Sequence, residues 1–261
     1  MKKIFLIFML VLLGGQCIIA QDKSLFEKHE FIFRGDTLLY RLLIPENYNP
    51  SKMYPMVLFL HGSGERGNDN EAQLVHGAEL FLRDSIRKNF PAFIIFPQCP
   101  SKDSWASTSS KKDSSGKRIF QFQTTGKATK TMSLVERLVR KIINQYPVTK
   151  KQLYVGGLSM GGMGTFDLVK RKPKLFAAAF PICGGADSSI APKLKKVNWW
   201  IFHGAKDKSV DPVYSQIMAD ALHKENASVM FTLYPNAEHN SWDNAFAEPG
   251  LLSWLFSNKK N

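Results

Sequence analysis

The sequence predicts an α/β fold with a mostly parallel central sheet, helices on both faces and an antiparallel hairpin at the N-terminal edge. Short apolar runs alternate with helical stretches along most of the chain, which is the order that strand–helix units produce. These runs contain few polar residues, as strands do when both faces of a parallel sheet are buried. The runs are residues 56–60, 92–96, 153–155, 177–182, 199–202 and 229–234.

The hairpin is predicted from residues 26–33 and 37–43, which alternate apolar and polar side chains on either side of Arg34-Gly35-Asp36. Alternation with period two is typical of a strand with one buried face, and a short polar turn joins two such strands as antiparallel neighbours. We expect this hairpin to lie at one edge of the sheet.

The clearest helix spans residues 131–146, where apolar residues recur at helical spacing. Ser133 and Glu136 offer a capping box at its start, and Pro147 ends it. Further helices are expected over residues 162–170, 212–224 and 241–256, the last interrupted by Pro249-Gly250.

Residues 101–130 show no period and are rich in serine, lysine, threonine and glycine. The segment follows a predicted strand and therefore starts at the edge of the sheet where sites of α/β proteins lie. A long loop in a compact domain is commonly either functional or a surface insertion, and both interpretations stay open here.

The first twenty residues have the pattern of a signal peptide. Lys2 and Lys3 precede an apolar run over residues 4–13, and Ala20 supplies the small residue at the cleavage site. The run is short for a membrane span, and the residues before Cys17 do not suit lipid attachment. We expect residues 1–20 to be removed, leaving residues 21–261 as a single catalytic domain that is secreted or periplasmic, without a stable membrane span.

The formal net charge is +13, which raises the question of nucleic-acid binding. The lysines lie in scattered pairs without interleaved aromatic residues or a nucleic-acid motif, so a solvated basic face is the favoured interpretation. Weak attraction of acidic polysaccharides or cell envelopes stays possible under this interpretation. After cleavage Cys99 and Cys183 remain, and the sequence leaves open whether they form a disulfide.

The strongest chemical signal is Gly157-Leu158-Ser159-Met160-Gly161, which lies between a predicted strand and a predicted helix. A serine on such a tight turn needs small neighbours, and the turn raises its hydroxyl above the sheet. The helix start also supplies backbone N–H groups that stabilise negative charge. We predict Ser159 as a nucleophile; the alternative is a structural glycine-rich turn with an idle serine.

The serine hydroxyl needs a histidine base to accept its proton. His239 lies in a polar loop between the last strand and the last helix, and we predict it as the base. The other histidines are less suitable: two precede a glycine directly after a strand, and the rest lie in the hairpin or in predicted helices. They are His61 and His203, and then His29, His76 and His223.

The acid that orients this base is predicted to be Asp207, which directly follows the strand at residues 199–202. Asp211 is a rival, but Pro212 after it indicates a helix start, where aspartate usually caps. Asp187 is a weaker alternative. The chain order of serine, aspartate and histidine is the one expected in hydrolases built on a strand-to-helix nucleophile turn.

An oxyanion hole needs a second backbone donor besides the Met160 N–H. Residues 61–64, His-Gly-Ser-Gly, follow a predicted strand directly, and their glycines let the backbone turn back over the site. We predict the Ser63 N–H as this donor and a supporting role for His61.

On these motifs the chain resembles the α/β-hydrolase superfamily, and more narrowly its secreted esterase branch of feruloyl esterases, polyhydroxybutyrate depolymerases and dienelactone hydrolases. The resemblance implies Ser159, Asp207 and His239 as catalytic residues, Ser63 and Met160 as oxyanion donors, and neither a metal nor an organic cofactor. Dienelactone hydrolases use a cysteine nucleophile, so the serine here points away from their reaction. The matching segments are residues 60–67, 96–100, 157–162, 180–185, 203–207 and 238–239.

We therefore predict a secreted serine carboxylesterase that removes feruloyl or acetyl groups from plant polysaccharides through an acyl-enzyme. Trp105 and Phe122 are predicted to stack on the substrate, and Arg66 and Gln98 to line its pocket. For Trp105 and Phe122 the alternative is packing of the loop on the domain, and for Arg66 it is a structural ion pair. The alternative functions are a short-chain carboxylesterase or lipase-like enzyme, a serine peptidase, and an inactive carbohydrate-binding protein.

Overall fold

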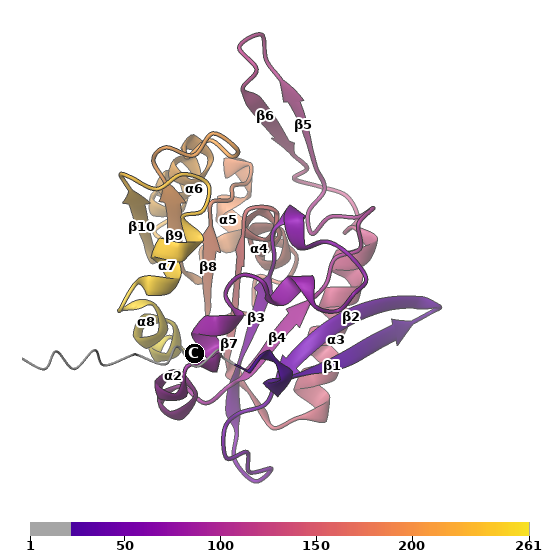
Figure 1. The fold of residues 1–261 in the computed structure, drawn as a ribbon. Helices are drawn as coiled ribbons and strands as arrows, with labels where there is room; N and C mark the ends of the chain where they lie inside the picture. The colour runs from indigo at the N-terminus through magenta and orange to yellow at the C-terminus, as the bar shows by residue number, and fades with distance from the viewer. Residues whose placement is uncertain (1–21, 261) are drawn as a thin grey trace, which may run out of the picture.

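The computed structural model describes residues 22–260 and has an eight-stranded sheet at its centre (Figure 1). The order of the strands across the sheet is β1-β2-β4-β3-β7-β8-β9-β10. Strand β2 runs antiparallel to both of its neighbours, and the pairs from β4 to β10 are parallel. The strands are β1 (Phe26–Phe33), β2 (Asp36–Leu43), β3 (Tyr54–Leu60), β4 (Phe93–Pro97), β7 (Val148–Leu158), β8 (Ala178–Ile182), β9 (Asn198–Gly204) and β10 (Val229–Tyr234). The predicted fold class is confirmed, whereas the predicted signal peptide lies outside the described residues.

The predicted edge hairpin is present as strands β1 and β2. Both residues of its turn have positive φ, 53° at Arg34 and 82° at Gly35. A two-residue turn of this kind matches the right-handed twist of the strands that it joins. The register therefore pairs Phe33 directly with Asp36 across the turn.

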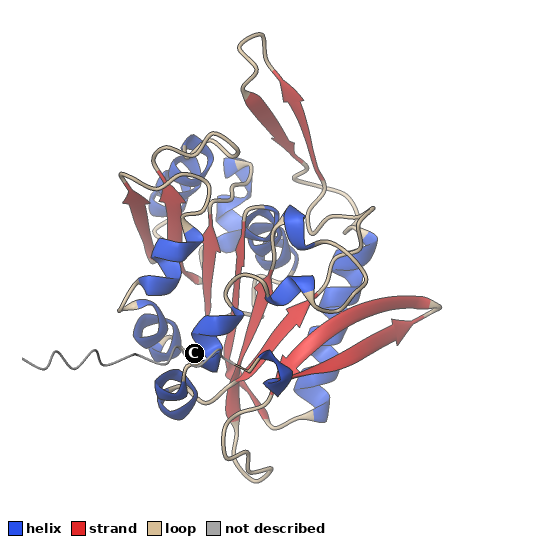
Figure 2. Cartoon of the chain, viewed as in Figure 1, coloured by secondary structure: helices blue, strands red, loops and turns tan. Residues whose placement is uncertain are grey.

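Helices cover both faces of the sheet (Figure 2). Alternate residues of β3 show why: Leu58 and Leu60 belong to one core cluster, and Val57 and Phe59 to the other. The first cluster is covered by α3 (Lys130–Gln145), α4 (Met160–Arg171), α5 (Ala191–Leu194) and α6 (Val213–Lys224). The second is covered by α1 (Ala78–Leu82), α2 (Asp84–Asn89), α7 (Trp242–Ala247) and α8 (Leu251–Ser257). Short 3-10 helices are η1 (Lys23–Leu25), η2 (Ser63–Glu65), η3 (Ala72–Leu74) and η4 (Ser188–Ile190).

The start of helix α3 differs from the expected one. Thr129 is the N-cap, and its Oγ1 accepts a hydrogen bond of 3.0 Å from the Met132 N–H. The predicted capping box is wrong, because Ser133 lies inside the helix and its hydroxyl donates back to the Thr129 carbonyl at 3.0 Å. Glu136 instead forms an ion pair of 2.8 Å with Lys172. The helix ends before Pro147, as predicted.

The final helical region is divided as its Pro249-Gly250 pair indicates. Helix α7 ends at Ala247 and helix α8 begins at Leu251, so the two residues fall between them. The break lets both short helices pack apolar side chains on the same face of the sheet.

Residues 101–130 contain a hairpin that the sequence did not indicate. Strands β5 (Thr108–Lys112) and β6 (Arg118–Phe122) pair antiparallel and project from the edge where the parallel strands end (Figure 1). None of their residues is buried, so no alternation of buried apolar side chains marks them. The hairpin is held by a 2.9 Å hydrogen bond from the Phe120 N–H to the Tyr214 hydroxyl, and by an ion pair between Lys117 and Asp211.

Within residues 22–260, Cys99 and Cys183 are buried and form no disulfide. In the same part of the chain no helix has the length and apolar character needed to cross a membrane.

We expect Thr129→Ala to lower the free energy of unfolding by about 1 to 2 kcal/mol, because it removes the N-cap hydrogen bond and also the 2.8 Å hydrogen bond from the hydroxyl to the Ser104 carbonyl. Ser133→Ala should cost less than half of this, because its hydroxyl bonds a carbonyl within the helix and caps nothing. Urea unfolding followed by circular dichroism compares the two variants. Equal losses would contradict the cap assignment.

Candidate active site

Ser159 lies in the sharp turn between strand β7 and helix α4. Its backbone is strained, with φ 54° and ψ −115°, a conformation that L-residues rarely adopt. The turn needs glycines because the neighbouring backbone is very close: a Cβ on Gly161 would lie 1.9 Å from the Leu60 carbonyl oxygen, and one on Gly157 2.5 Å from the Gly161 oxygen. The glycines therefore let helix α4 begin directly against the ends of two strands.

Three distant side chains meet at this turn and form a Ser–His–Asp triad (Ser159, His239 and Asp207). The Nε2 of His239 lies 3.0 Å from the Ser159 Oγ, and its Nδ1 lies 2.7 Å from the Asp207 Oδ2. His239 is carried by the loop after β10, and Asp207 by the loop after β9. The structure thus brings together the three residues predicted as nucleophile, base and acid.

The Asp207 carboxylate is buried and fully hydrogen-bonded. Its Oδ1 accepts from the Ser209 and Val210 N–H groups at 2.8 and 3.0 Å. Its Oδ2 contacts both His239 and His203. Burial raises the pKa of the Asp207 carboxyl, but the hydrogen bonds from the two histidines and the Val210 N–H outweigh it and hold this pKa well below its usual range. The group is therefore a carboxylate at neutral pH.

The predicted oxyanion donors flank Ser159. Met160 is the first residue of α4, and Ser63 is the first residue of η2. Among the described residues neither backbone N–H donates to a protein acceptor. A Cβ on Gly62 would lie 3.7 Å from the Ser159 Cβ, which brings the Ser63 loop against the nucleophile turn. Two uncommitted donors beside a hydroxyl suit the charge of a tetrahedral intermediate.

His61 and Trp105 support the loop that carries Ser63. The His61 Nε2 accepts from the Cys99 N–H at 2.9 Å, so its Nδ1 carries the proton and donates to the Gly62 carbonyl at 2.6 Å. Trp105 is fully buried and donates from its indole N–H to the His61 carbonyl at 2.8 Å. The prediction that Trp105 stacks on substrate is therefore wrong, because the chain after β4 turns inward and packs the indole under the loop.

Gln98 and Arg66 also support loops. The Gln98 side chain is buried; its Oε1 accepts from the Asn70 N–H at 2.8 Å and its Nε2 donates to the Asp69 Oδ1 at 2.8 Å. No polar atom of this amide is left for substrate, so the prediction for Gln98 is wrong. Arg66 is exposed and donates to the Ser63 carbonyl at 3.0 Å and to the Asp103 carbonyl at 3.4 Å, and its contact with substrate stays a prediction.

Of the two aromatic residues predicted to contact substrate, Phe122 is the one that is partly exposed. It packs edge-on against Tyr214, with 5.5 Å between ring centroids, in a small cluster that also contains Phe120, Met163 and Val210. Met163 lies one turn after Ser159 on α4. A small recess of about 20 Å³ runs between Phe122, Met163 and the loop after β8. The β5–β6 hairpin therefore packs beside helix α4 and the loop that carries Asp207.

His239 also has aromatic neighbours that sequence reasoning did not connect with the site. The Trp242 ring lies edge-on to His239 at 5.5 Å and tilted to His76 at 4.8 Å. His76 faces the Glu65 carboxylate at 3.8 Å. Trp242 begins helix α7 three residues after His239, and this spacing is the one signal in the sequence that places it at the site.

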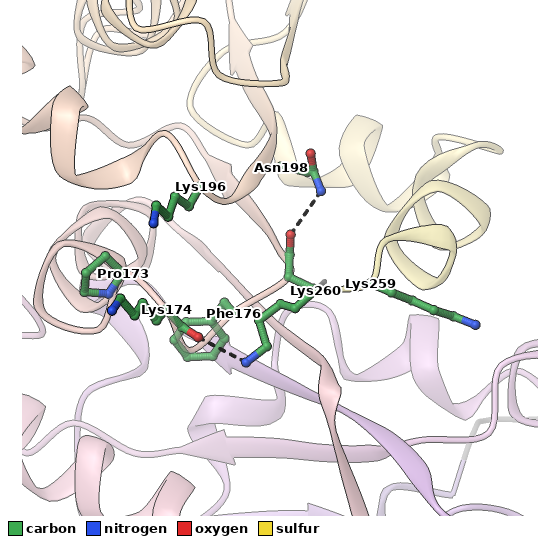
Figure 3. Close-up of a pocket in the computed structure, with 8 residues that line it drawn as sticks. Pro173, Lys174, Phe176, Lys196, Asn198, Lys259 and Lys260 are labelled. Carbon is green, nitrogen blue, oxygen red and sulfur yellow. Dashed lines mark hydrogen bonds between the residues drawn. The ribbon is translucent and has the colours of Figure 1, made fainter.

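A larger cavity of about 710 Å³ lies elsewhere on the molecule (Figure 3). It opens at the start of strands β8 and β9, where Lys260 donates to the Lys174 carbonyl at 3.0 Å and Asn198 to the Ala177 carbonyl at 3.3 Å. The triad lies at the other end of these strands, so this cavity cannot present a substrate to Ser159.

The site also contains a group of side chains with metal-ligand chemistry. Ligand-type atoms of Cys183, Asp207 and His239 lie within 4.8 Å of one another. Burial raises the pKa of the Cys183 thiol, so it stays protonated and is a poor metal ligand. Asp207 and His239 are already bonded to each other. The arrangement suits a hydrogen-bonded triad better than a metal centre.

The mostly parallel sheet, the strained serine turn and the triad at the strand ends define an α/β-hydrolase fold. The family model described as phospholipase/carboxylesterase matches residues 48–248. The chain therefore belongs to the phospholipase/carboxylesterase family of α/β-hydrolases.

Solved structures agree with this family. A thermostable esterase is 31% identical, with a TM-score of 0.81 over 91% of this chain, and this chain spans 64% of that esterase's length. A ferulic acid esterase from Anaeromyces mucronatus is 15% identical (TM-score 0.65; 89% of this chain and 90% of that one). An acylaminoacyl peptidase from Pyrococcus horikoshii is 12% identical (TM-score 0.61; 90% and 42%). The last two show likeness of fold alone, and no curated protein sequence matches the chain.

The buried His61 should make stability depend on pH. Burial lowers the pKa of His61 to about 4, although its bond to Gly62 acts in the other direction. An unfolded histidine has a pKa of about 6.5, so the unfolded chain binds the proton more readily. The free energy of unfolding should therefore fall as the pH drops from about 6.5 towards 4, by about 3 kcal/mol from this group at most.

His61→Gln should remove this contribution, because the amide does not titrate and its oxygen can still accept from the Cys99 N–H. Urea midpoints measured between pH 7.5 and 4.5 check the slope. His223→Gln, at an exposed histidine of helix α6, is the matched control and should keep the wild-type slope. The same pH slope in wild type and His61→Gln would refute the assignment.

Proposed function

We propose that this protein is a serine carboxylesterase in which Ser159 is the nucleophile, His239 the base and Asp207 the acid that orients the base. The observation that carries the proposal is the continuous hydrogen-bonded chain from the Ser159 Oγ through both nitrogens of His239 to the Asp207 Oδ2. His239 accepts the proton from Ser159 through Nε2, because Nδ1 donates to the carboxylate. The hydroxyl oxygen can then attack an ester carbonyl.

In the proposed reaction the new C–O bond turns the ester carbonyl into an oxyanion between the Ser63 and Met160 N–H groups. Each donor of this kind contributes about 3 kcal/mol to lowering a barrier in comparable enzymes. The protonated His239 then gives its proton to the leaving alcohol, and the acyl group remains on Ser159. Water, deprotonated by His239, attacks the acyl-enzyme in the same way and releases the carboxylic acid.

We further propose that the substrates are feruloyl or acetyl esters of plant polysaccharides, met outside the cytoplasm after loss of residues 1–20. The half-buried Phe122 and the recess beside Met163 support this choice on the acyl side. An aromatic acyl group would lie flat on the exposed part of the Phe122 ring, whereas an acetyl group is too small to need this contact. The likeness in fold to a ferulic acid esterase is in keeping with the proposal.

Replacing Ser159 by alanine should lower kcat on p-nitrophenyl acetate by a factor of about 10⁴ to 10⁶, as loss of the nucleophile does in related chemistry. A fluorophosphonate probe should label the wild type and leave Ser159→Ala unlabelled. Ser63→Ala is the matched control, since it keeps the backbone N–H and should retain both activity and labelling. Full activity of a folded Ser159→Ala variant would end the proposal.

Phe122→Ala should raise KM for methyl ferulate about 3- to 10-fold, the value of one aromatic stacking contact. KM for p-nitrophenyl acetate should change little, because the acetyl group does not reach the ring. Phe33→Ala removes an equally half-buried phenylalanine from the far edge hairpin and serves as the control. A wild type that hydrolyses p-nitrophenyl acetate but neither methyl ferulate nor acetylated xylan would contradict the proposed polysaccharide substrates. The proposed esterase activity would still stand.

A further inference from the structure

A second histidine contacts the same carboxylate oxygen of Asp207 that His239 contacts. His203 lies near the end of strand β9, and its side chain is fully buried. Its Nε2 lies 3.1 Å from the Asp207 Oδ2 and 2.9 Å from the Val210 carbonyl oxygen. Its Nδ1 lies 2.7 Å from the Ser215 Oγ on helix α6. Every polar atom of this imidazole is therefore engaged.

The contacts assign the proton on Nε2. This nitrogen faces a carboxylate and a carbonyl, which only accept, so it must carry a hydrogen and donate. The Ser215 hydroxyl lies between Nδ1 and the Gly184 carbonyl, which is 3.0 Å away. It can donate to Nδ1 of a neutral ring, or accept from Nδ1 and donate to Gly184 when the ring is charged. In either state the Nε2 hydrogen of His203 is shared between the Asp207 Oδ2 and the Val210 carbonyl oxygen.

Asp207 Oδ2 is consequently shared by two imidazoles. One is His239, whose other nitrogen contacts the Ser159 hydroxyl. The other is His203, whose second nitrogen contacts Ser215 instead. With the two backbone donors on Oδ1, the carboxylate is held by four hydrogen bonds from two sides. Rotation of the carboxylate out of the plane that His239 needs would break several of them at once.

We propose that His203 is a positioning residue of the active site: its Nε2–H holds the Asp207 carboxylate against His239 and withdraws part of the negative charge that this base would otherwise receive. The proposal rests on the proposed function. The withdrawn charge matters because a carboxylate bonded to one imidazole alone would bind the proton of His239 more tightly. His203 thus tunes the proton affinity of the base without touching substrate.

Other groups that titrate near this network are few and identifiable. Asp211 lies on the same loop as Asp207 and is paired with Lys117 of the β5–β6 hairpin. Cys183 approaches Asp207 and His239 from the end of strand β8. Helix α6 contributes the uncharged Ser215. The substitutions of His203 below change none of these groups.

The test compares three substitutions of His203 in the full chain, with p-nitrophenyl acetate as substrate. His203→Phe keeps a ring and loses the donor; His203→Asn carries an amide that reaches only the Nδ1 position; His203→Gln places an amide N–H at the Nε2 position. We expect the His203→Phe and His203→Asn variants to have a kcat about 10-fold lower than the wild type, with little change in KM. This loss is far below the factor of about 10⁴ that follows when the acid itself loses its charge in a serine protease.

The pH profile separates positioning from mere packing. In the Phe and Asn variants the acid limb of kcat/KM should move to higher pH by about half a unit or more, because His239 then binds its proton more tightly. His203→Gln should restore the wild-type limb. Ser215→Ala, which disturbs the same pocket without touching Asp207, should leave the limb unchanged. If the His203→Phe variant does not fold, as judged by circular dichroism, the test compares the His203→Asn variant with the His203→Gln variant.

The two levels of the proposal fail in different ways. A folded wild type without esterase activity would overturn the proposed function and this inference together. An active wild type whose His203→Asn variant keeps the wild-type acid limb would overturn this inference alone, even if kcat fell, because lost packing lowers the rate without moving the limb.

Discussion

The close approach of backbone to backbone at the nucleophile turn is the constraint on which the rest of the structure depends. Helix α4 begins against the ends of β3 and β8 with no room for side chains: a Cβ on Gly161 would lie 1.9 Å from the Leu60 oxygen, and one on Gly162 2.7 Å from the Ile182 oxygen. This contact places Ser159 beside the loop that follows β3. Because the same strands end at one edge, His239 and Asp207 need only short loops to reach the serine hydroxyl.

The supporting side chains show how buried polar groups keep such an edge rigid. His61 and Trp105 hold the Gly62 loop, and Gln98 holds the loop after it, each through hydrogen bonds that leave little unsatisfied. A buried donor or acceptor without a partner costs free energy, so these networks allow one arrangement of the loops and penalise others. Ser159 can remain in a strained conformation because its surroundings do not relax.

Residues with a strong local pattern were predictable from sequence. The serine turn, the strand and helix on either side of it and the break at Pro249-Gly250 follow from glycine spacing, apolar runs and proline. The β5–β6 hairpin was not predictable, because its strands have no buried face to impose alternation. Trp105 and Gln98 were assigned to substrate because both follow strands at the active edge. That position does not say whether a side chain points outward or packs beneath the loop, which depends on contacts distant in sequence.

The triad and the surface around Phe122 come from two different kinds of structure at the edge of the sheet that carries the site. The triad and its buried supports come from the ends of core strands, where a change of one residue disturbs the backbone. The surface around Phe122 comes from a hairpin fixed to the domain mainly by Tyr214 and Asp211. Changes in that hairpin alter the surface that an acyl group meets without moving Ser159 or its partners. Acyl preference can therefore vary on this scaffold while the chemistry at the serine stays the same.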